Sequence, residues 1–245
     1  MLIAAAVLLV AFVVIEQRSE APLVPFEFFR LRSVSAANAT MLAAGAAIIG
    51  LFYFLSLYLQ RVLGYSAIQA GVSQLPLAAG IVLAAGVASS LVERVGVRRV
   101  LIAGLALFAG GLLWFAQLPV RGAYLADVLG PSLLIALGLG FAFVPITILA
   151  VSGVADREYG LASGLVNTSQ QIGGALGLAV LSTLATTRTN HLLEAHHPLD
   201  QALTLGFHHG FLGAAAFVLL GIVAAATIGT RRAKRAQTLA ADVAA

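Results

Sequence analysis

The stretch Gly160–Thr183, "GLASGLVNTSQQIGGALGLAVLST", is long enough to cross a bilayer as a helix, but its centre is polar. Apolar and small residues flank five consecutive polar ones, Asn167–Gln171. Lipid tails offer no hydrogen-bond partner to a hydroxyl or an amide. We therefore expect this helix to turn its polar run toward protein or a water-filled cavity, inside a bundle of membrane helices.

The composition of the whole chain places most of it in lipid. Of the 245 residues, 60% are hydrophobic and only 10% are charged, and the mean hydropathy is +1.00. Soluble domains carry about 25% charged residues. The absence of cysteine excludes disulfides and thiolate metal sites. The net charge of +4 comes from basic residues scattered between apolar runs, which is typical of topology signals and not of a nucleic-acid interface.

Seven apolar segments are visible, and the last six have the length of a membrane span. They are 2–15, 36–59, 68–91, 98–117, 124–148, 160–187 and 208–230. The first is too short to span, and no Lys or Arg precedes it as in a signal peptide. Spanning segments must satisfy their own backbone groups, so the predicted fold class is all-α, a polytopic membrane bundle. Two connections are predicted to be long, 16–35 and 188–207.

The distribution of positive charge predicts the orientation. Of the 14 Lys and Arg residues, only Arg61, Arg121 and Arg188 fall in one set of connections, and the other eleven fall in the opposite set and the C-terminal tail. By the positive-inside rule the richer set and the C-terminus are cytoplasmic. Seven crossings then place Met1 outside, on a half-length helix, which suggests that further sequence precedes it.

The connection Ser89–Leu101, "SSLVERVGVRRVL", is short and charged. Gly96 is expected to turn the chain between two helices. The Glu93 carboxylate is expected to face the N-terminus of the next helix, where the helix dipole favours anions. The three arginines of this loop are expected either to pair with acids on neighbouring helices or to act as a plain positive-inside anchor.

This loop resembles the second copy of the cytoplasmic loop pattern of the major facilitator superfamily. The family pattern is Gly-x-Leu-Ala-Asp-Arg-x-Gly-Arg-Lys. Matching residues are Leu91, Arg94, Gly96 and Arg98, and the departures are Ser89, Glu93 and Val97. The stretches Pro22–Ser33, Leu57–Gly80 and Gly160–Thr183 are similar to the fourteen-helix drug:proton antiporters of that superfamily, the EmrB/QacA type.

The resemblance implies an architecture and an activity. Residues 36–230 would be the C-terminal six-helix half, built as two three-helix repeats, after a partial helix and loop in 1–35 and before a basic cytoplasmic tail in 231–245. In the cell membrane it would work by alternating access with a missing N-terminal half, exporting drugs or other small hydrophobic compounds in exchange for protons, without a cofactor. Glu93, Arg94, Gly96 and Arg98 would tune the inward-facing gate. The alternative that remains open is a truncated, non-transporting membrane protein, acting as scaffold or partner or without function.

Three amides define the predicted site. Asn167, Gln170 and Gln171 have i, i+3 and i+4 spacing and share one helix face. They either hydrogen-bond to neighbouring helices or line a substrate cavity near the middle of the membrane. Small residues in helical spacing predict a tight packing seam on the same helix; they are Gly160, Gly164, Gly173, Ala175 and Gly177.

Asp127 is the one acidic residue expected inside a span. An ionisable group there is a candidate for relaying protons or meeting a cationic substrate. The competing hypothesis is that it reaches the outer interface or bonds locally near that end of its helix. Pro76, Pro131 and Pro145 each free a backbone carbonyl and permit a bend in the helix that contains them, although ordinary membrane helices also tolerate proline.

Two other classes of function are weakly supported. The five histidines between His191 and His209 have no recognised metal spacing and are expected in a solvated outer loop, with the last two opening the final helix. An intramembrane serine protease would need Ser163 to meet one of these histidines, but Leu161 breaks the Gly-x-Ser-Gly pattern. No catalytic residue and no metal site is therefore predicted.

Overall fold

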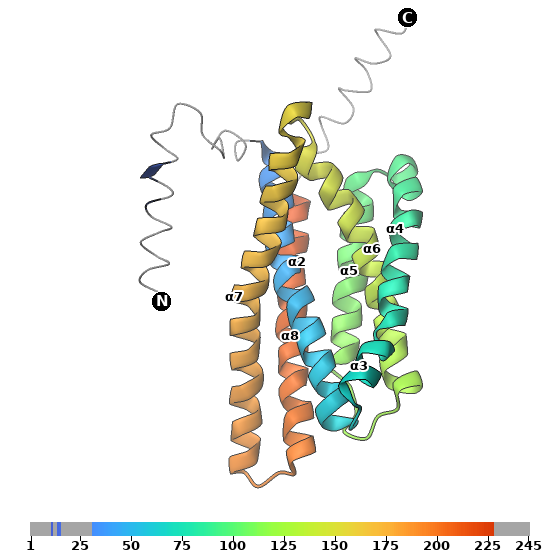
Figure 1. Ribbon diagram of the computed structural model, residues 1–245, viewed down its shortest axis with the longest axis vertical. Helices are drawn as coiled ribbons and strands as arrows, with labels where there is room; N and C mark the ends of the chain where they lie inside the picture. Colours follow the sequence, from blue (N-terminus) through green and yellow to red (C-terminus); the bar gives the residue numbers. More distant parts are fainter. Residues whose placement is uncertain (1–10, 12–13, 16–30, 228–245) are drawn as a thin grey trace, which may run out of the picture.

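The computed structural model describes residues 11, 14, 15 and 31–227. The part that it describes is helical, with short connections and no β-strand (Figure 1). This confirms the all-α prediction. The short segment 2–15, apart from three residues, and the basic tail 231–245 lie outside the described residues.

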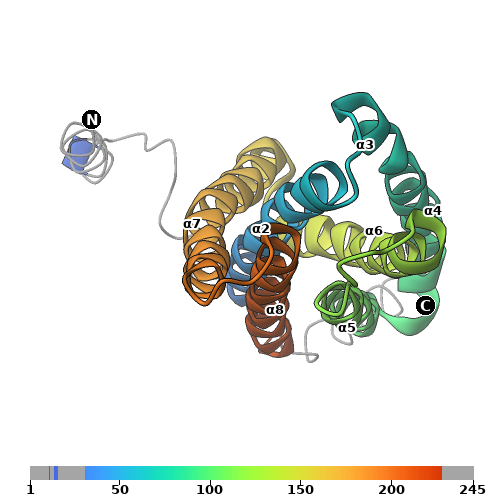
Figure 2. The same ribbon diagram turned by 90° about the horizontal axis from the view of Figure 1, so that it is seen from below.

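Each of the six long predicted segments forms a helical unit. They are α2 (Arg32–Leu57) continued by the π-helical turn η2 (Tyr58–Val62), α3 (Ala67–Ser73) with α4 (Leu75–Val95), α5 (Val97–Phe115), the π-helical turn η3 (Tyr124–Val128) continued by α6 (Leu129–Val151), α7 (Tyr159–Glu194) after the 3-10 turn η4 (Asp156–Glu158), and α8 (Leu199–Ala226). Viewed along the helices, α7, α2, α6 and α4 form one row, and α8 and α5 lie beside α2 and α6 as a second row (Figure 2).

Local sequence explains three of the helix ends. Gly96 ends α4 with φ +96°, a conformation that residues with a Cβ rarely adopt, so the predicted turn is confirmed. The predicted bend at Pro76 is a break at Gln74, with Pro76 in the first turn of α4, where a missing N–H costs nothing. Ser66 caps the short α3, since its Oγ accepts the N–H of Gln69 at 3.2 Å.

Aromatic rings join the two rows of helices. Phe211 of α8 lies 5.2 Å from Phe115 of α5 and 5.9 Å from Phe54 of α2, measured between ring centroids. All three side chains are buried. Other apolar side chains point away from the bundle, as with Val82 and Leu83, which are 72% and 73% exposed. Together with five described helices that are long and apolar enough to cross a membrane, this outer surface fits a multi-pass protein surrounded by a lipid bilayer.

The predicted long loop at 188–207 is wrong. α7 continues to Glu194 and α8 begins at Leu199, so only 195–198 joins them. The helices persist because they pack on each other: Thr189 is buried, and its hydroxyl donates to the carbonyls of Ala185 and, at 3.3 Å, of Ala202. Hydropathy misses this hairpin because its residues are polar. We call this end of the molecule the hairpin end, and the opposite end, with Arg32, Arg94, Arg98, Arg99 and Arg157, the basic end.

Candidate functional site

A seam of small residues holds α7 against α2. A Cβ on Gly173 would collide with the carbonyl of Leu42, and one on Gly177 with the side chain of Ala46. On α2, Gly45 leaves room for the main chain of Gln170. Small residues let two membrane helices approach this closely. The predicted seam is therefore confirmed for Gly173 and Gly177, and it fixes the rotation of α7 about its axis.

The polar run divides between this seam and the open side of the helix. Ser169 turns inward, and its Oγ donates to Asn38 Oδ1 at 2.8 Å, while the Asn38 amide donates to the Val34 carbonyl at 2.9 Å. Asn167 and Gln171 are exposed and Gln170 is partly exposed. Within residues 31–227 these three amide side chains have no hydrogen-bond partner. The interhelical bond comes from Ser169 and Asn38, which the sequence analysis did not single out.

Along the open side of α7, small and polar residues recur at a spacing of 11 residues, in three sets of three. Eight of its nine members are exposed and Ser182 is partly exposed. They are Gly160, Gln171, Ser182; Gly164, Ala175, Thr186; and Thr168, Ala179, Asn190. Eleven residues complete three helical turns, so these residues form one continuous line, which we call the open face. In contrast to the seam glycines, Gly160 and Gly164 have nothing within 4 Å of an added Cβ.

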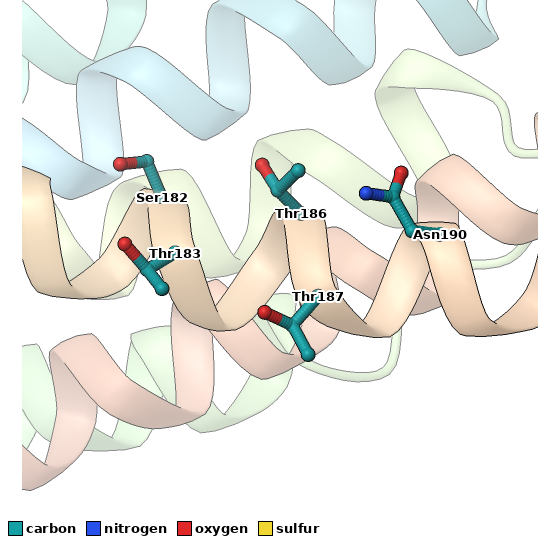
Figure 3. Close-up of a pocket in the computed structure, with 5 residues that line it drawn as sticks. All are labelled: Ser182, Thr183, Thr186, Thr187 and Asn190. Atoms are coloured by element: carbon teal, nitrogen blue, oxygen red, sulfur yellow. The ribbon is translucent and has the colours of Figure 1, made fainter.

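The open face ends in a polar groove toward the hairpin end (Figure 3). Its volume is about 280 Å³, and it is lined by Ser182, Thr183, Thr186, Thr187 and Asn190. Ser182 and Thr183 both donate to the Ala179 carbonyl of their own helix. Thr186, Thr187 and Asn190 have no side-chain hydrogen bond among the described residues. The 11-residue spacing that leads to this groove is readable from the sequence but was not predicted.

An apolar ridge runs beside the open face on the same helix. It consists of Ile172, Leu176, Val180 and Leu184, at intervals of four residues. Their side chains are between 46% and 63% exposed. α7 therefore shows two kinds of surface to its surroundings, one suited to lipid and one poorly suited to it.

Asp127 makes the local bond that the competing hypothesis describes. It lies in the first turn of the α6 unit, within η3, and is partly exposed. Its Oδ2 accepts the backbone N–H of Ala123 at 2.7 Å. The carboxylate thus satisfies one of the free donors that every helix N-terminus leaves.

The charged loop at the basic end has one well-placed side chain. Arg98 donates from Nη2 to the carbonyl of Ala226, the last residue of α8, at 2.6 Å. A cation there interacts favourably with the helix dipole. Glu93 and Arg94 are exposed and make no hydrogen bond or ion pair within residues 31–227. The expected contact of Glu93 with the N-terminus of α5 is not made, and no side chain caps that helix end.

His196 and His197 lie exposed in the connection 195–198, as predicted, but the other three histidines are placed differently. His191 lies in α7, and His208 and His209 lie well inside α8 instead of opening it. No group of three possible metal ligands occurs among the described residues. Gly206 packs on Ala185 and Thr189, so His208 lies close to the level of Ala185 along the bundle. Ser163 is 22 residues before Ala185 on α7, which is roughly 33 Å along the helix. That separation rules out a serine–histidine pair in this structure.

Comparison with known families identifies the superfamily of this chain. The model of the Major Facilitator Superfamily matches residues 1–178. The chain belongs to the Major Facilitator Superfamily. The match extends from the start of the chain into α7.

Relatives of this superfamily member are named as export and resistance proteins. The chain is 40% identical over 215 residues to the cephamycin export protein CmcT of Amycolatopsis lactamdurans, covering 86% of this chain and 42% of the relative. It is 34% identical to the puromycin resistance protein pur8 of Streptomyces alboniger, covering 89% and 44%. For the lincomycin resistance protein of Streptomyces lincolnensis the identity is 36%, covering 73% and 37%. The chain thus spans less than half the length of these relatives.

Proposed function

We propose that this chain forms the C-terminal half of an exporter of drugs or other small hydrophobic compounds. The observation that carries the proposal is the identity with relatives named for cephamycin export and for puromycin and lincomycin resistance. In this proposal an N-terminal six-helix half completes the transporter in the cell membrane. The two halves alternate access and exchange substrate for protons, and the basic end with the C-terminus faces the cytoplasm.

The open face of α7 supports the proposal that a second half completes the transporter. Thr186 and Asn190 would leave a hydroxyl and an amide unpaired if this face met hydrocarbon. Gly160 and Gly164 pack on nothing within the chain, and a small residue on a membrane helix is of most use where another backbone approaches. We therefore expect protein or water, not lipid, along this line. Its 11-residue period favours a right-handed crossing with the helix that covers it.

We assign roles to the predicted residues on the same basis. Asn167 and Gln171 are exposed, with Gln171 in the open face itself, and the partly exposed Gln170 lies between the open face and the seam. Neutral amides in such places can orient a substrate at small desolvation cost. At the basic end, Glu93 and Arg94 are free to contact the other half, while Gly96 and Arg98 set the geometry of their loop. Asp127 holds the start of the α6 unit and is not assigned a proton-carrying role.

The test of the substrate role uses the complete transporter in cells that lack other exporters. Asn167→Leu, Gln170→Leu and Gln171→Leu are compared with Ile172→Ala on the apolar ridge. Loss of one amide contact to a substrate should lower its export by roughly two- to tenfold and change the order of preferred drugs. Ile172→Ala should leave export unchanged. If all three leucine variants export every drug as the natural protein does, the amides do not line the cavity.

The test of the two-half proposal uses the 245-residue chain itself. It is expressed alone, and together with a separately encoded N-terminal half. Resistance that appears only on co-expression supports the proposal. Resistance from the chain alone, or none under either condition despite full membrane insertion, contradicts it.

A further inference from the structure

The connection 116–123, between α5 and η3, is tied to the bundle more closely than its lack of regular structure suggests. It separates the first three helical units from the last three. Its Leu118 side chain is buried in the core. Two neighbouring carbonyls, of Leu118 and Pro119, accept hydrogen bonds from side chains of two different helices.

The first bond comes from the end of α2. Tyr58 is fully buried, and its hydroxyl donates to the Pro119 carbonyl at 2.7 Å. The same hydroxyl lies against Gly122, where an added Cβ would be only 2.6 Å away. Tyr58 is the first residue of the π-helical turn η2, which continues α2 at the hairpin end.

The second bond comes from the last helix. His208 of α8 is half-buried, and its Nε2–H donates to the Leu118 carbonyl at 2.7 Å. Three residues further along α8, Phe211 contacts Phe115, which joins α5 to α8. The connection is therefore fastened to the first and to the last helix of the described bundle.

Further bonds close the arrangement. Asp127 accepts the Ala123 N–H, and Asp127 Oδ2 would lie 3.3 Å from a Cβ on Gly122. The Tyr124 hydroxyl donates to the Ser73 carbonyl at the end of α3. In the connection 152–158, between α6 and α7 at the basic end, the side-chain bond to a distant residue among the described residues is the one from Ser33 Oγ to the Ser152 carbonyl at 3.0 Å, and it is exposed.

We propose that 116–123 is a lock that fastens the two groups of three helices at the hairpin end, with Tyr58 and His208 as its two fastening side chains. The connection 152–158, whose described bond to a distant residue is exposed, should then loosen more readily than 116–123. The proposal concerns the chain itself and stands whether or not export is found.

The experiment is hydrogen exchange by mass spectrometry on the purified chain in lipid nanodiscs. Backbone amides of 116–123 should exchange more slowly than those of 152–158. Tyr58→Phe and His208→Leu should each speed exchange in 116–123 by about tenfold, the effect of one lost buried hydrogen bond. His208→Gln, which keeps a side-chain N–H, should restore most of the protection.

Two control variants come from the same helices. Tyr53→Phe changes an exposed tyrosine on α2 whose hydroxyl has no bond among the described residues. His209→Leu changes an exposed histidine that bonds only to the Leu205 carbonyl of its own helix. Both should leave exchange in 116–123 unchanged. Equal exchange in the two connections of the natural chain overturns the proposal, and so does a Tyr58→Phe profile identical to that of Tyr53→Phe.

Discussion

Gly177 and Gly164 lie on the same helix, thirteen residues apart, and meet opposite surroundings. Gly177 faces Ala46 so closely that no Cβ fits, whereas an added Cβ on Gly164 has no neighbour within 4 Å. Glycine in a helix interior costs about 1 kcal/mol relative to alanine. The seam of α7 offsets this cost by close packing against α2. The open face offers no such offset within the chain, which is why we infer that its partner lies elsewhere.

The largest effect is expected from substituting these two glycines. Gly177→Ala should destabilise the chain by about 1–3 kcal/mol, because α2 and α7 must separate. Gly164→Ala should stabilise it by roughly 0.5–1 kcal/mol, because the helix gains and nothing is crowded. The midpoint of thermal unfolding in detergent measures both. Equal effects of the two substitutions would remove the distinction between seam and open face.

A bulkier substitution at Gly164 tests the open face in the complete transporter. Gly164→Leu places a bulky side chain where we expect the other half to pack. Export should fall strongly while the amount of inserted protein stays normal. Val180→Leu, on the apolar ridge, is the matched control and should export normally. Normal export by Gly164→Leu would mean that no protein packs closely on the open face at this position.

A labelling experiment compares the groove with the apolar ridge, and we expect a difference of intermediate size between them. The chain has no cysteine, so single cysteines report on one position each. Thr186→Cys in the groove should react with a water-soluble maleimide in the complete transporter, and the rate should change when substrate is added. Leu176→Cys on the ridge should stay unreactive in lipid. Equal reactivity at the two positions would show that the groove is not separated from the bilayer.

Much of the fold follows from the sequence because lipid leaves the backbone few choices. Six apolar runs became six helical units, and Gly96 and Pro76 marked a turn and a break as expected. The hairpin between α7 and α8 was missed because hydropathy detects only residues that lie in lipid. Thr189 and Leu192 keep those helices together by packing, which spacing alone does not reveal.

The site was predicted only in outline. Spacing placed Asn167 and Gln171 together on an exposed side, but the rotation of α7 is set by Gly173 and Gly177 against α2. That rotation sends Ser169 to Asn38 and leaves Gln170 at the boundary. A single sequence does not state which of five consecutive polar residues meets a neighbour. The long-range bonds of Tyr58 and His208 to a connection were invisible for the same reason.

The smallest effect is expected from the polar bond within the seam. Ser169→Ala removes the donor to Asn38 Oδ1 and should cost about 0.6 kcal/mol, the average for such bonds between membrane helices. Thr168→Ala is the matched control, because Thr168 donates to the Gly164 carbonyl of its own helix. A double-mutant cycle with Asn38→Ala isolates the pair. A coupling energy near 0.6 kcal/mol, beside the larger cost of Gly177→Ala, would mean that backbone proximity holds α7 in place. A coupling energy above about 2 kcal/mol would instead mean that the Ser169–Asn38 hydrogen bond contributes most to holding α7 against α2, and that the seam glycines only leave room for it.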